Sequence, residues 1–367
     1  KIDSHQHFWN PRRGDYDWMP MDNEILARVY GPTDLEPHLL ATGVDQTVLI
    51  QAAATVEETE YMLGIADASP RIAGVVGWID FENPDHAHHL RRLAKHPKFL
   101  GVRPMIQDIP DTDWMLRDDI QWAYELIIEC DLTFDALGFP QHLANFLTLF
   151  TRYSDMRFVI DHCMKPQIRN HSEDSFTHWA DGMSRLADQT TAYCKYSGLV
   201  TESDGWSLEG LRPYVEHLLK TFGSDRLMWG SDWPVCRLEA SYDAWHSAAR
   251  ALTADLSKAA QDRIFGGTAQ AFYRLCLTWA AAAFCPVDTA SDKDSPRILL
   301  AAYVPTKTSP APCVDITSTK CALCTLQGPL GAEKATPSPP IVRMISASGA
   351  SSASFDNVAA GLNPLSS

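Results

Sequence analysis

The chain begins with Lys1-Ile2-Asp3-Ser4-His5-Gln6-His7, a short run that reads as a β-strand with polar side chains at its end. Two α/β folds compete for a chain of this kind, a (β/α)8 barrel and a doubly wound sheet. A doubly wound sheet usually carries a glycine-rich phosphate turn directly after its first strand. The run at residues 3–7 contains no glycine, so the opening of the chain favours the barrel.

Short strand-like runs alternate with helical patterns as far as Leu275, which is the rhythm of repeated β-strand and α-helix units. Eight strands are predicted, at residues 1–5, 46–52, 72–79, 99–104, 132–136, 157–161, 192–197 and 226–231. Helical patterns fall between or after them at residues 57–68, 119–129, 141–153, 175–187, 208–222 and 240–254. Eight such units match a TIM barrel, which typically has about 250 residues. We therefore expect a (β/α)8 barrel over residues 1–275.

The composition changes near Leu275. All 13 histidines precede this point, and so does the whole net negative charge. Residues 276–367 are rich in Ala, Ser, Thr and Pro, a composition that buries too little apolar surface to offset its ordering entropy. We expect a disordered, low-complexity tail or the product of a gene-model error, rather than a second domain. Cys321 and Cys324 form a C-x-x-C pair there, but a structural zinc site needs two further ligands.

The charge balance restricts the partners. The 367 residues carry 31 Lys and Arg against 46 Asp and Glu, a formal net charge of -15 at pH 7. This balance disfavours sequence-independent binding to nucleic acid or to anionic membranes. No stretch approaches the roughly 18 apolar residues of a spanning helix, and the N-terminus lacks a signal pattern. We expect a cytoplasmic enzyme with a small-molecule substrate, whose oligomeric state the sequence leaves open.

Two histidines end the first predicted strand with a spacing of two residues. Because side chains alternate along a strand, His5 and His7 point to the same face, which we expect to be the barrel interior. Two imidazoles on one face could share a metal ion. An isolated H-x-H is more often a hydrogen-bonded pair at a strand end, so this motif needs support from elsewhere in the chain.

Further polar residues come at the ends of the sixth and eighth predicted strands. His162 ends the run Phe158-Val159-Ile160-Asp161-His162, which starts with three apolar residues, and Asp232 follows the hydrophobic run at residues 227–231. Barrel active sites form at the C-terminal ends of the strands, so these two residues are expected to meet the histidine pair. Histidine nitrogens with a carboxylate oxygen suit zinc and leave a position for water. An Asp in this place can also take a proton from the attacking water.

Five motifs, in this order, resemble the amidohydrolase superfamily and within it the lactonase-like amidohydrolase-2 group. They are Asp3-Ser4-His5-Gln6-His7-Phe8-Trp9, Gly101-Val102-Arg103-Pro104, Asp161-His162-Cys163-Met164-Lys165-Pro166, Lys195-Tyr196-Ser197-Gly198-Leu199 and Gly230-Ser231-Asp232-Trp233-Pro234. The run at residues 265–273 resembles the end of that domain, so the resemblance covers nearly all of residues 1–275. It implies a hydrolase that opens a lactone ring, such as that of a sugar-acid lactone, by attack of an activated water.

The resemblance also implies roles for individual residues. His5, His7 and His162 match positions that surround the metal site, and Asp232 matches a carboxylate that serves as base and as metal ligand. His162 and Asp232 are the expected catalytic residues, and Arg103 matches a position suited to orienting the substrate. The expected cofactor is one divalent metal, with zinc foremost. Catalysis without metal, through Asp232 and the histidines, is the alternative.

Three other side chains are candidates for substrate contacts. Trp9 and Trp233 adjoin the proposed ligands and could form an apolar wall, although buried aromatic residues are more often part of the core. Lys195 shares its strand face with Ser197 and could line the barrel. The histidines at residues 86–89 are more consistent with a solvated helix than with a metal site.

Two other functions stay open at this point. One is a metal-dependent decarboxylase on the same barrel, which would release carbon dioxide from an aromatic or enoic acid. The other is a catalytically inactive barrel used for binding, and the complete set of strand-end histidines and Asp232 argues against it. Hydrolysis of a lactone is the leading hypothesis, and the identity of the lactone depends on loop geometry.

Overall fold

The computed structural model describes residues 1–275, and the predicted tail with its C-x-x-C pair lies outside the described residues. Within residues 1–275, eight parallel strands form one sheet whose spatial order is the order of the sequence. The strands are β1 (Ile2–Gln6), β2 (Gln46–Ile50), β3 (Ile72–Gly77), β4 (Phe99–Val102), β5 (Thr133–Ala136), β6 (Arg157–Ile160), β7 (Tyr193–Tyr196) and β8 (Leu227–Trp229). The predicted TIM barrel is confirmed.

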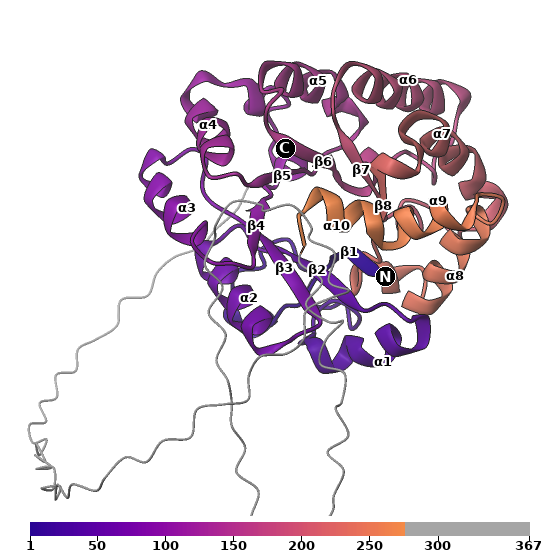
Figure 1. The fold of residues 1–367 in the computed structure, drawn as a ribbon, viewed down its shortest axis with the longest axis horizontal. Helices are drawn as coiled ribbons and strands as arrows, with labels where there is room; N and C mark the ends of the chain where they lie inside the picture. Colours follow the sequence, from indigo (N-terminus) through magenta and orange to yellow (C-terminus); the bar gives the residue numbers. More distant parts are fainter. Residues whose placement is uncertain (276–367) are drawn as a thin grey trace, which may run out of the picture. The chain divides into compact units, whose positions relative to one another are not determined.

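Helices α1 to α8 surround the strands as an outer ring (Figure 1). The α-helices of the described chain are α1 (Pro32–Thr42), α2 (Val56–Ala68), α3 (Ala87–Leu93), α4 (Gln121–Glu129), α5 (Leu143–Arg152), α6 (Glu173–Gln189), α7 (Leu208–Arg226), α8 (Tyr242–Leu252), α9 (Lys258–Asp262) and α10 (Thr268–Phe272). None of the helices in residues 1–275 combines the length and the apolar composition that a membrane span requires.

The barrel closes between its first strand and the residues that follow its last strand. Gln6 forms a parallel bridge with Trp233, just beyond β8. The backbone N–H of His7 donates to the Trp233 carbonyl at 2.7 Å, and the N–H of Asp232 donates to the His5 carbonyl at 2.8 Å. These two hydrogen bonds hold the ends of β1 and β8 together, so the polar residues of both strands reach the same place.

The pairing of β1 with β2 changes register between Asp3 and Gln6. Such an irregularity inserts an extra residue into one strand and re-aims the side chains that follow it. Ile2, before the shift, packs in an apolar cluster with Val48 of β2. His5, after the shift, reaches the buried polar groups of β7. The first strand therefore contributes an apolar residue near its start and two histidines at its end.

The last described helix, α10, fills the barrel interior at the N-terminal ends of the strands. Phe272 and Tyr273 pack with strand residues such as Val76, Val159 and Met228 in one buried apolar cluster. Arg157, the first residue of β6, donates to the carbonyl of Phe272 at 2.8 Å, which places α10 at the N-terminal ends of the strands. This arrangement closes one end of the barrel and leaves the C-terminal ends of the strands for the site.

Candidate active site

The histidine pair at the end of β1 lies in the barrel interior, as the spacing of two residues predicts. The Nε2 atoms of His5 and His7 are 3.2 Å apart. The Nδ1 of His7 lies 2.9 Å from the Ile50 carbonyl, and because a carbonyl can only accept, this Nδ1 carries the proton. The Nε2 of His7 therefore presents a lone pair toward the Nε2 of His5.

Asp232 brings its carboxylate to these two nitrogens. Its Oδ1 lies 3.3 Å from the Nε2 of His7 and 3.8 Å from the Nε2 of His5. The residue has a φ of 55°, in the left-handed region, which an Asp tolerates better than most residues. Its backbone hydrogen bond to His5 fixes this turn directly after β8. Three strand-end side chains thus converge on one point.

His162 reaches the same carboxylate from the end of β6, with its Nε2 3.8 Å from the Oδ1 of Asp232. Its Nδ1 is 3.0 Å from the hydroxyl of Ser197, which orients the ring. The backbone from His162 to Lys165 is left-handed throughout, with φ between 46° and 58°. Each such residue costs roughly 1–2 kcal/mol, so the surrounding structure imposes this turn. The turn places both His162 and Lys165 at the cavity.

Gly198 is required beside this turn. Its φ is 71°, and a Cβ at this position would lie 2.8 Å from the ring of His162. Any larger residue would push the imidazole away from Ser197 and from the carboxylate of Asp232.

A buried network of charges lies directly behind His5. The Nζ of Lys195 is 2.5 Å from the Oδ2 of Asp135, 2.9 Å from the Oδ1 of Asp161 and 3.1 Å from the Nδ1 of His5. Arg103 lies 3.3 Å from the other oxygen of Asp161 and donates to the Gln51 carbonyl. Two cations face two carboxylates, so the charges within this network are balanced.

Asp135 and Asp161 were not among the predicted site residues. Asp135 is the next-to-last residue of β5, Asp161 directly follows the apolar end of β6, and both are fully buried. That position was the available signal, because buried carboxylates need a partner. Their partner is Lys195, whose side chain is fully buried as well.

Burial keeps the three imidazoles neutral. It lowers the pKa of His162 to about 4 and the pKa of His7 below its ordinary value. The pKa of His5 falls well below the ordinary value, because burial and the Lys195 ammonium act in the same direction. Burial would raise the pKa of Asp232, but His162 and His7 outweigh this effect and lower it. Near neutral pH the site therefore holds neutral imidazoles and an ionised carboxylate.

A cavity of about 310 Å³ opens above these groups. It is large enough for a small ring with several substituents. Polar groups form its floor, and Trp9 and Trp18 form one wall. The ring centres of these two tryptophans are 5.6 Å apart in an edge-to-face arrangement. Its lining residues are His7, Trp9, Trp18, Ala52, Arg103, Met105, Gln107, Asp108, Leu137, His162, Lys165, Asp232 and Val235.

The predicted substrate-contacting residues divide into two groups. Arg103 and Trp9 line the cavity. Lys195 and Trp233 do not: Lys195 lies beneath His5, and Trp233 is buried against Tyr30 at a ring-centre distance of 4.9 Å. The substrate roles of all four residues stay predictions.

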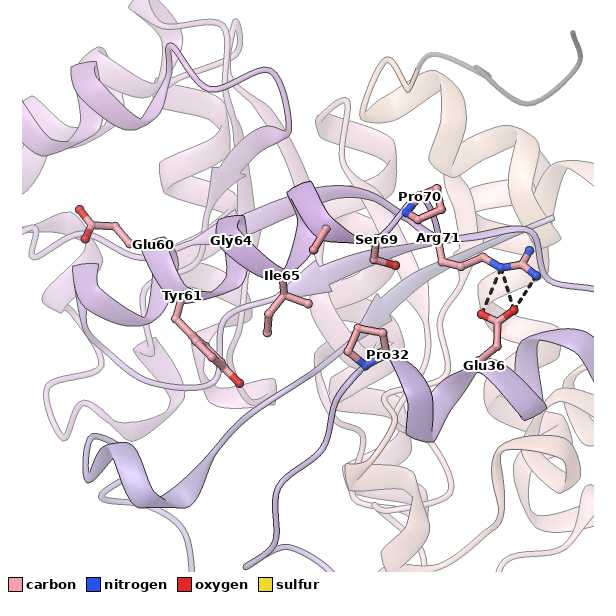
Figure 2. Close-up of a pocket in the computed structure, with 10 residues that line it drawn as sticks. Pro32, Glu36, Glu60, Tyr61, Gly64, Ile65, Ser69, Pro70 and Arg71 are labelled. Atoms are coloured by element: carbon pink, nitrogen blue, oxygen red, sulfur yellow. Dashed lines mark hydrogen bonds and ion pairs between the residues drawn. The ribbon is translucent and has the colours of Figure 1, made fainter. Parts of the chain in front are cut away.

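A larger hollow, of about 820 Å³, lies outside the barrel (Figure 2). It is bordered by residues of α1 and α2, including Tyr61 and Ile65, and the Glu36–Arg71 ion pair closes one end. It contains none of the histidines or Asp232, so the hollow is separate from the candidate active site.

The strand-end residues fit a single divalent cation. His5, His7 and Asp232 each offer one ligand atom, and these atoms lie within 4.8 Å of one another. The neutral state of the imidazoles and the fixed tautomer of His7 are what a metal ligand requires. His5, Asp161 and His162 form a second group with the same spacing limit. The two groups have His5 in common, whose Nε2 faces His7 and Asp232 and whose Nδ1 faces Asp161.

A family model described as amidohydrolase matches residues 2–275. The chain belongs to the amidohydrolase family. This amidohydrolase is 40% identical over 280 residues to an L-fucono-1,5-lactonase of Burkholderia ambifaria, across 75% of this chain and 96% of that protein. It is 35% identical over 286 residues to an L-fucono-1,5-lactonase of Burkholderia multivorans, again across 75% and 96%.

Solved structures agree with this assignment. A Burkholderia multivorans amidohydrolase with bound zinc shares 35% identity and a TM-score of 0.71, across 75% of this chain and 99% of that one. A 5-carboxyvanillate decarboxylase of Sphingomonas paucimobilis shares the fold alone, at 15% identity and a TM-score of 0.54. The predicted family resemblance is confirmed, and the prediction of a hydrolase acting on a cyclic ester agrees with the names of the relatives.

Proposed function

We propose that this amidohydrolase opens the ring of a sugar-acid lactone of the L-fucono-1,5-lactone class. The observation that carries the proposal is the position of Asp232, whose ionised carboxylate lies beside three neutral imidazoles at the floor of a small cavity. The names of the relatives that are 35–40% identical support the substrate class. The polar side chains of the cavity lining, Gln107 and Lys165 among them, suit a ring that carries hydroxyl groups.

We propose zinc as the ion, held by His5, His7, His162 and Asp232. A bound zinc ion would lower the pKa of a water to about 7 and polarise the ester carbonyl. The zinc in the structure of the Burkholderia multivorans relative supports this choice. Imidazole and carboxylate ligands also suit other divalent metals, so metal analysis decides the identity.

Asp232 and Arg103 have separate roles in the proposed hydrolysis. The Asp232 carboxylate takes a proton from water as the oxygen of that water forms a bond to the ester carbonyl carbon. The Arg103 guanidinium, which lines the cavity, stabilises the negative charge that develops on the carbonyl oxygen. The ring carbon–oxygen bond then breaks, and Asp232 returns the proton to the departing alkoxide. The product is a hydroxy acid, which releases a proton at neutral pH.

The test combines metal analysis with a panel of lactones. Purified protein is analysed for metal by mass spectrometry, and acid release from each lactone is followed with a pH indicator before and after chelation. We expect near-stoichiometric zinc and chelator-sensitive acid release from L-fucono-1,5-lactone. Acid release that persists without metal would contradict the zinc assignment and place the chemistry on Asp232 and the histidines. No acid release from any lactone, or release of carbon dioxide from an aromatic acid, would contradict the proposed function.

A further inference from the structure

A second cavity, of about 370 Å³, adjoins the active-site cavity. It lies beyond the C-terminal ends of β5, β6 and β7. Its lining differs from the polar groups at the floor of the active-site cavity. The side chains that border it include Phe139, Gln141, Lys165, Gln167, His178 and Glu202. Within the described chain, none of these residues belongs to either of the candidate metal-binding groups.

Lys165 is the residue that the linings of the two cavities share. It lines both of them, and its Nζ donates to the Oε1 of Gln107 at 2.6 Å across the active-site side. The same ammonium lies 5.4 Å from the ring centre of Phe139 on the other side. The Lys165 side chain is half-buried, and it can change rotamer without any movement of the backbone.

The electrostatics of Glu202 also indicate that the two cavities are close. Burial raises the pKa of Glu202, the Lys165 ammonium opposes this rise, and the Asp232 carboxylate adds to it. The catalytic carboxylate therefore acts on a residue that lines the neighbouring cavity. A molecule bound across Lys165 would contact the linings of both cavities.

The lining of the second cavity selects a class of ligand. Lys165 and Glu202 contribute one charge of each sign, which favours an uncharged group. The amides of Gln141 and Gln167 and the imidazole of His178 supply both donors and acceptors for hydroxyl groups. Phe139 offers an apolar face for ring carbons. An aromatic face surrounded by mixed donors and acceptors suits a sugar ring.

We propose that this cavity is a second binding subsite, which takes a glycosyl group attached to the lactone that is opened in the first. The proposal rests on the lactonase function proposed above and extends the substrate class from simple aldonolactones to glycosylated ones. Gln167 is exposed, so a larger residue at this position fills the subsite without disturbing the core.

The experiment compares L-fucono-1,5-lactone with its 2-O-, 3-O- and 4-O-galactosyl derivatives. We expect at least one derivative to be hydrolysed with a kcat/KM within ten-fold of the parent lactone. Gln167→Trp should lower the ratio of kcat/KM for that derivative over the parent at least ten-fold. Gln189→Trp, at an exposed position in the last turn of α6, is the matched control and should leave the ratio within two-fold. The subsite would be overturned if the parent lactone is hydrolysed and none of its galactosyl derivatives is. It would also be overturned if Gln167→Trp and Gln189→Trp give the same ratio of kcat/KM for the derivative over the parent.

A binding measurement separates this proposal from the proposed function. Saturation-transfer NMR with the open-chain galactosyl-L-fuconates needs no turnover. We expect the galactosyl protons to receive saturation from the natural protein and to lose it in Gln167→Trp. Absence of saturation overturns the subsite even if the parent lactone is hydrolysed. Saturation without hydrolysis of any lactone supports the subsite and refutes the lactonase function.

Discussion

Asp232 carries the proton transfer in the proposed reaction, and a single substitution tests it. Asn keeps the shape of the side chain but cannot take a proton, so Asp232→Asn should lower kcat by about 10³-fold. Steady-state kinetics on the best lactone measure the loss, and metal analysis of the variant shows whether the ion is retained. Asp188→Asn, at an exposed position in α6, is the control. A kcat for Asp232→Asn within ten-fold of the natural protein would contradict the assignment.

Lys195 holds the buried charges behind His5 in place. Lys195→Met removes one cation and leaves two buried carboxylates, Asp135 and Asp161, without it. Removing one partner of a buried ion pair typically costs about 3–5 kcal/mol, and we expect a loss of unfolding free energy of this order. Denaturant unfolding measures it.

The control for this substitution is Lys258→Met. Lys258 pairs with Asp262 on the surface of α9, where solvent screens an ion pair and its removal should change the unfolding free energy little. If both variants lose the same unfolding free energy, the buried ion pairs of Lys195 do not contribute more to stability than a surface ion pair does.

Single residues explain where prediction from the sequence succeeded and where it failed. The spacing of His5 and His7 predicts a shared face, because the strand period is two, and their Nε2 atoms do meet. No such rule gives the depth of a side chain in the barrel. Lys195 was predicted to line the barrel, and the structure places it inside the barrel, beneath His5, with which it is in contact, and outside the cavity lining.

At the scale of elements, the loop after β2 is held by one buried carboxyl group. Glu58, in the first turn of α2, accepts from the backbone N–H groups of Ala52 and Ala53. The Ala52 carbonyl in turn accepts from the indole of Trp18, which forms part of the cavity wall. Burial raises the pKa of Glu58 to about 8.

This shift predicts a dependence of stability on pH. Between pH 4.5 and about 8 the folded chain keeps a proton on Glu58 that the unfolded chain has released, so the unfolding free energy should fall as pH rises through this window. Glu58→Gln carries no such proton, and its unfolding free energy should fall less steeply. Urea unfolding at pH 5, 6.5 and 8 measures both slopes. Glu57→Gln, at the exposed neighbouring position, should keep the natural slope, and parallel slopes for Glu58→Gln would contradict the prediction.

The elements themselves were predicted to different degrees. All eight strands were placed, because runs such as Val48-Leu49-Ile50 are short and apolar and include β-branched residues. Helix α1 was missed, since Pro37 lies inside it and only two of its apolar residues, Leu35 and Leu39, are buried. The left-handed turn that begins at His162 also had no signal, because it contains no glycine and is imposed by tertiary contacts.

At the scale of the whole molecule, the predicted domain boundary at Leu275 can be tested with two truncations. Leu275 belongs to the apolar cluster inside the barrel, together with Phe272 and Tyr273. A chain that ends at Leu275 should unfold at the same denaturant midpoint as the full chain and keep its lactonase activity. A chain that ends at Gly267 loses α10 and should be unfolded or insoluble, because two large buried aromatic side chains are removed.

Equal stability of the two truncated chains would contradict a structural role for α10. A lower midpoint for the chain that ends at Leu275 would show that residues beyond it contribute to the fold. Circular dichroism and denaturant titration distinguish these outcomes.

The closure of the barrel also fixes when the site can form during synthesis. The first strand carries His5 and His7, and its partner on one side, the segment around Asp232, is more than 220 residues further along the chain. A ribosome must therefore make almost the whole barrel before these three side chains can meet. A nascent chain that has not reached Asp232 holds histidines but lacks the carboxylate of the proposed ligand set. If the proposed metal binds as described, its loading follows the closure of the barrel between β1 and the segment after β8.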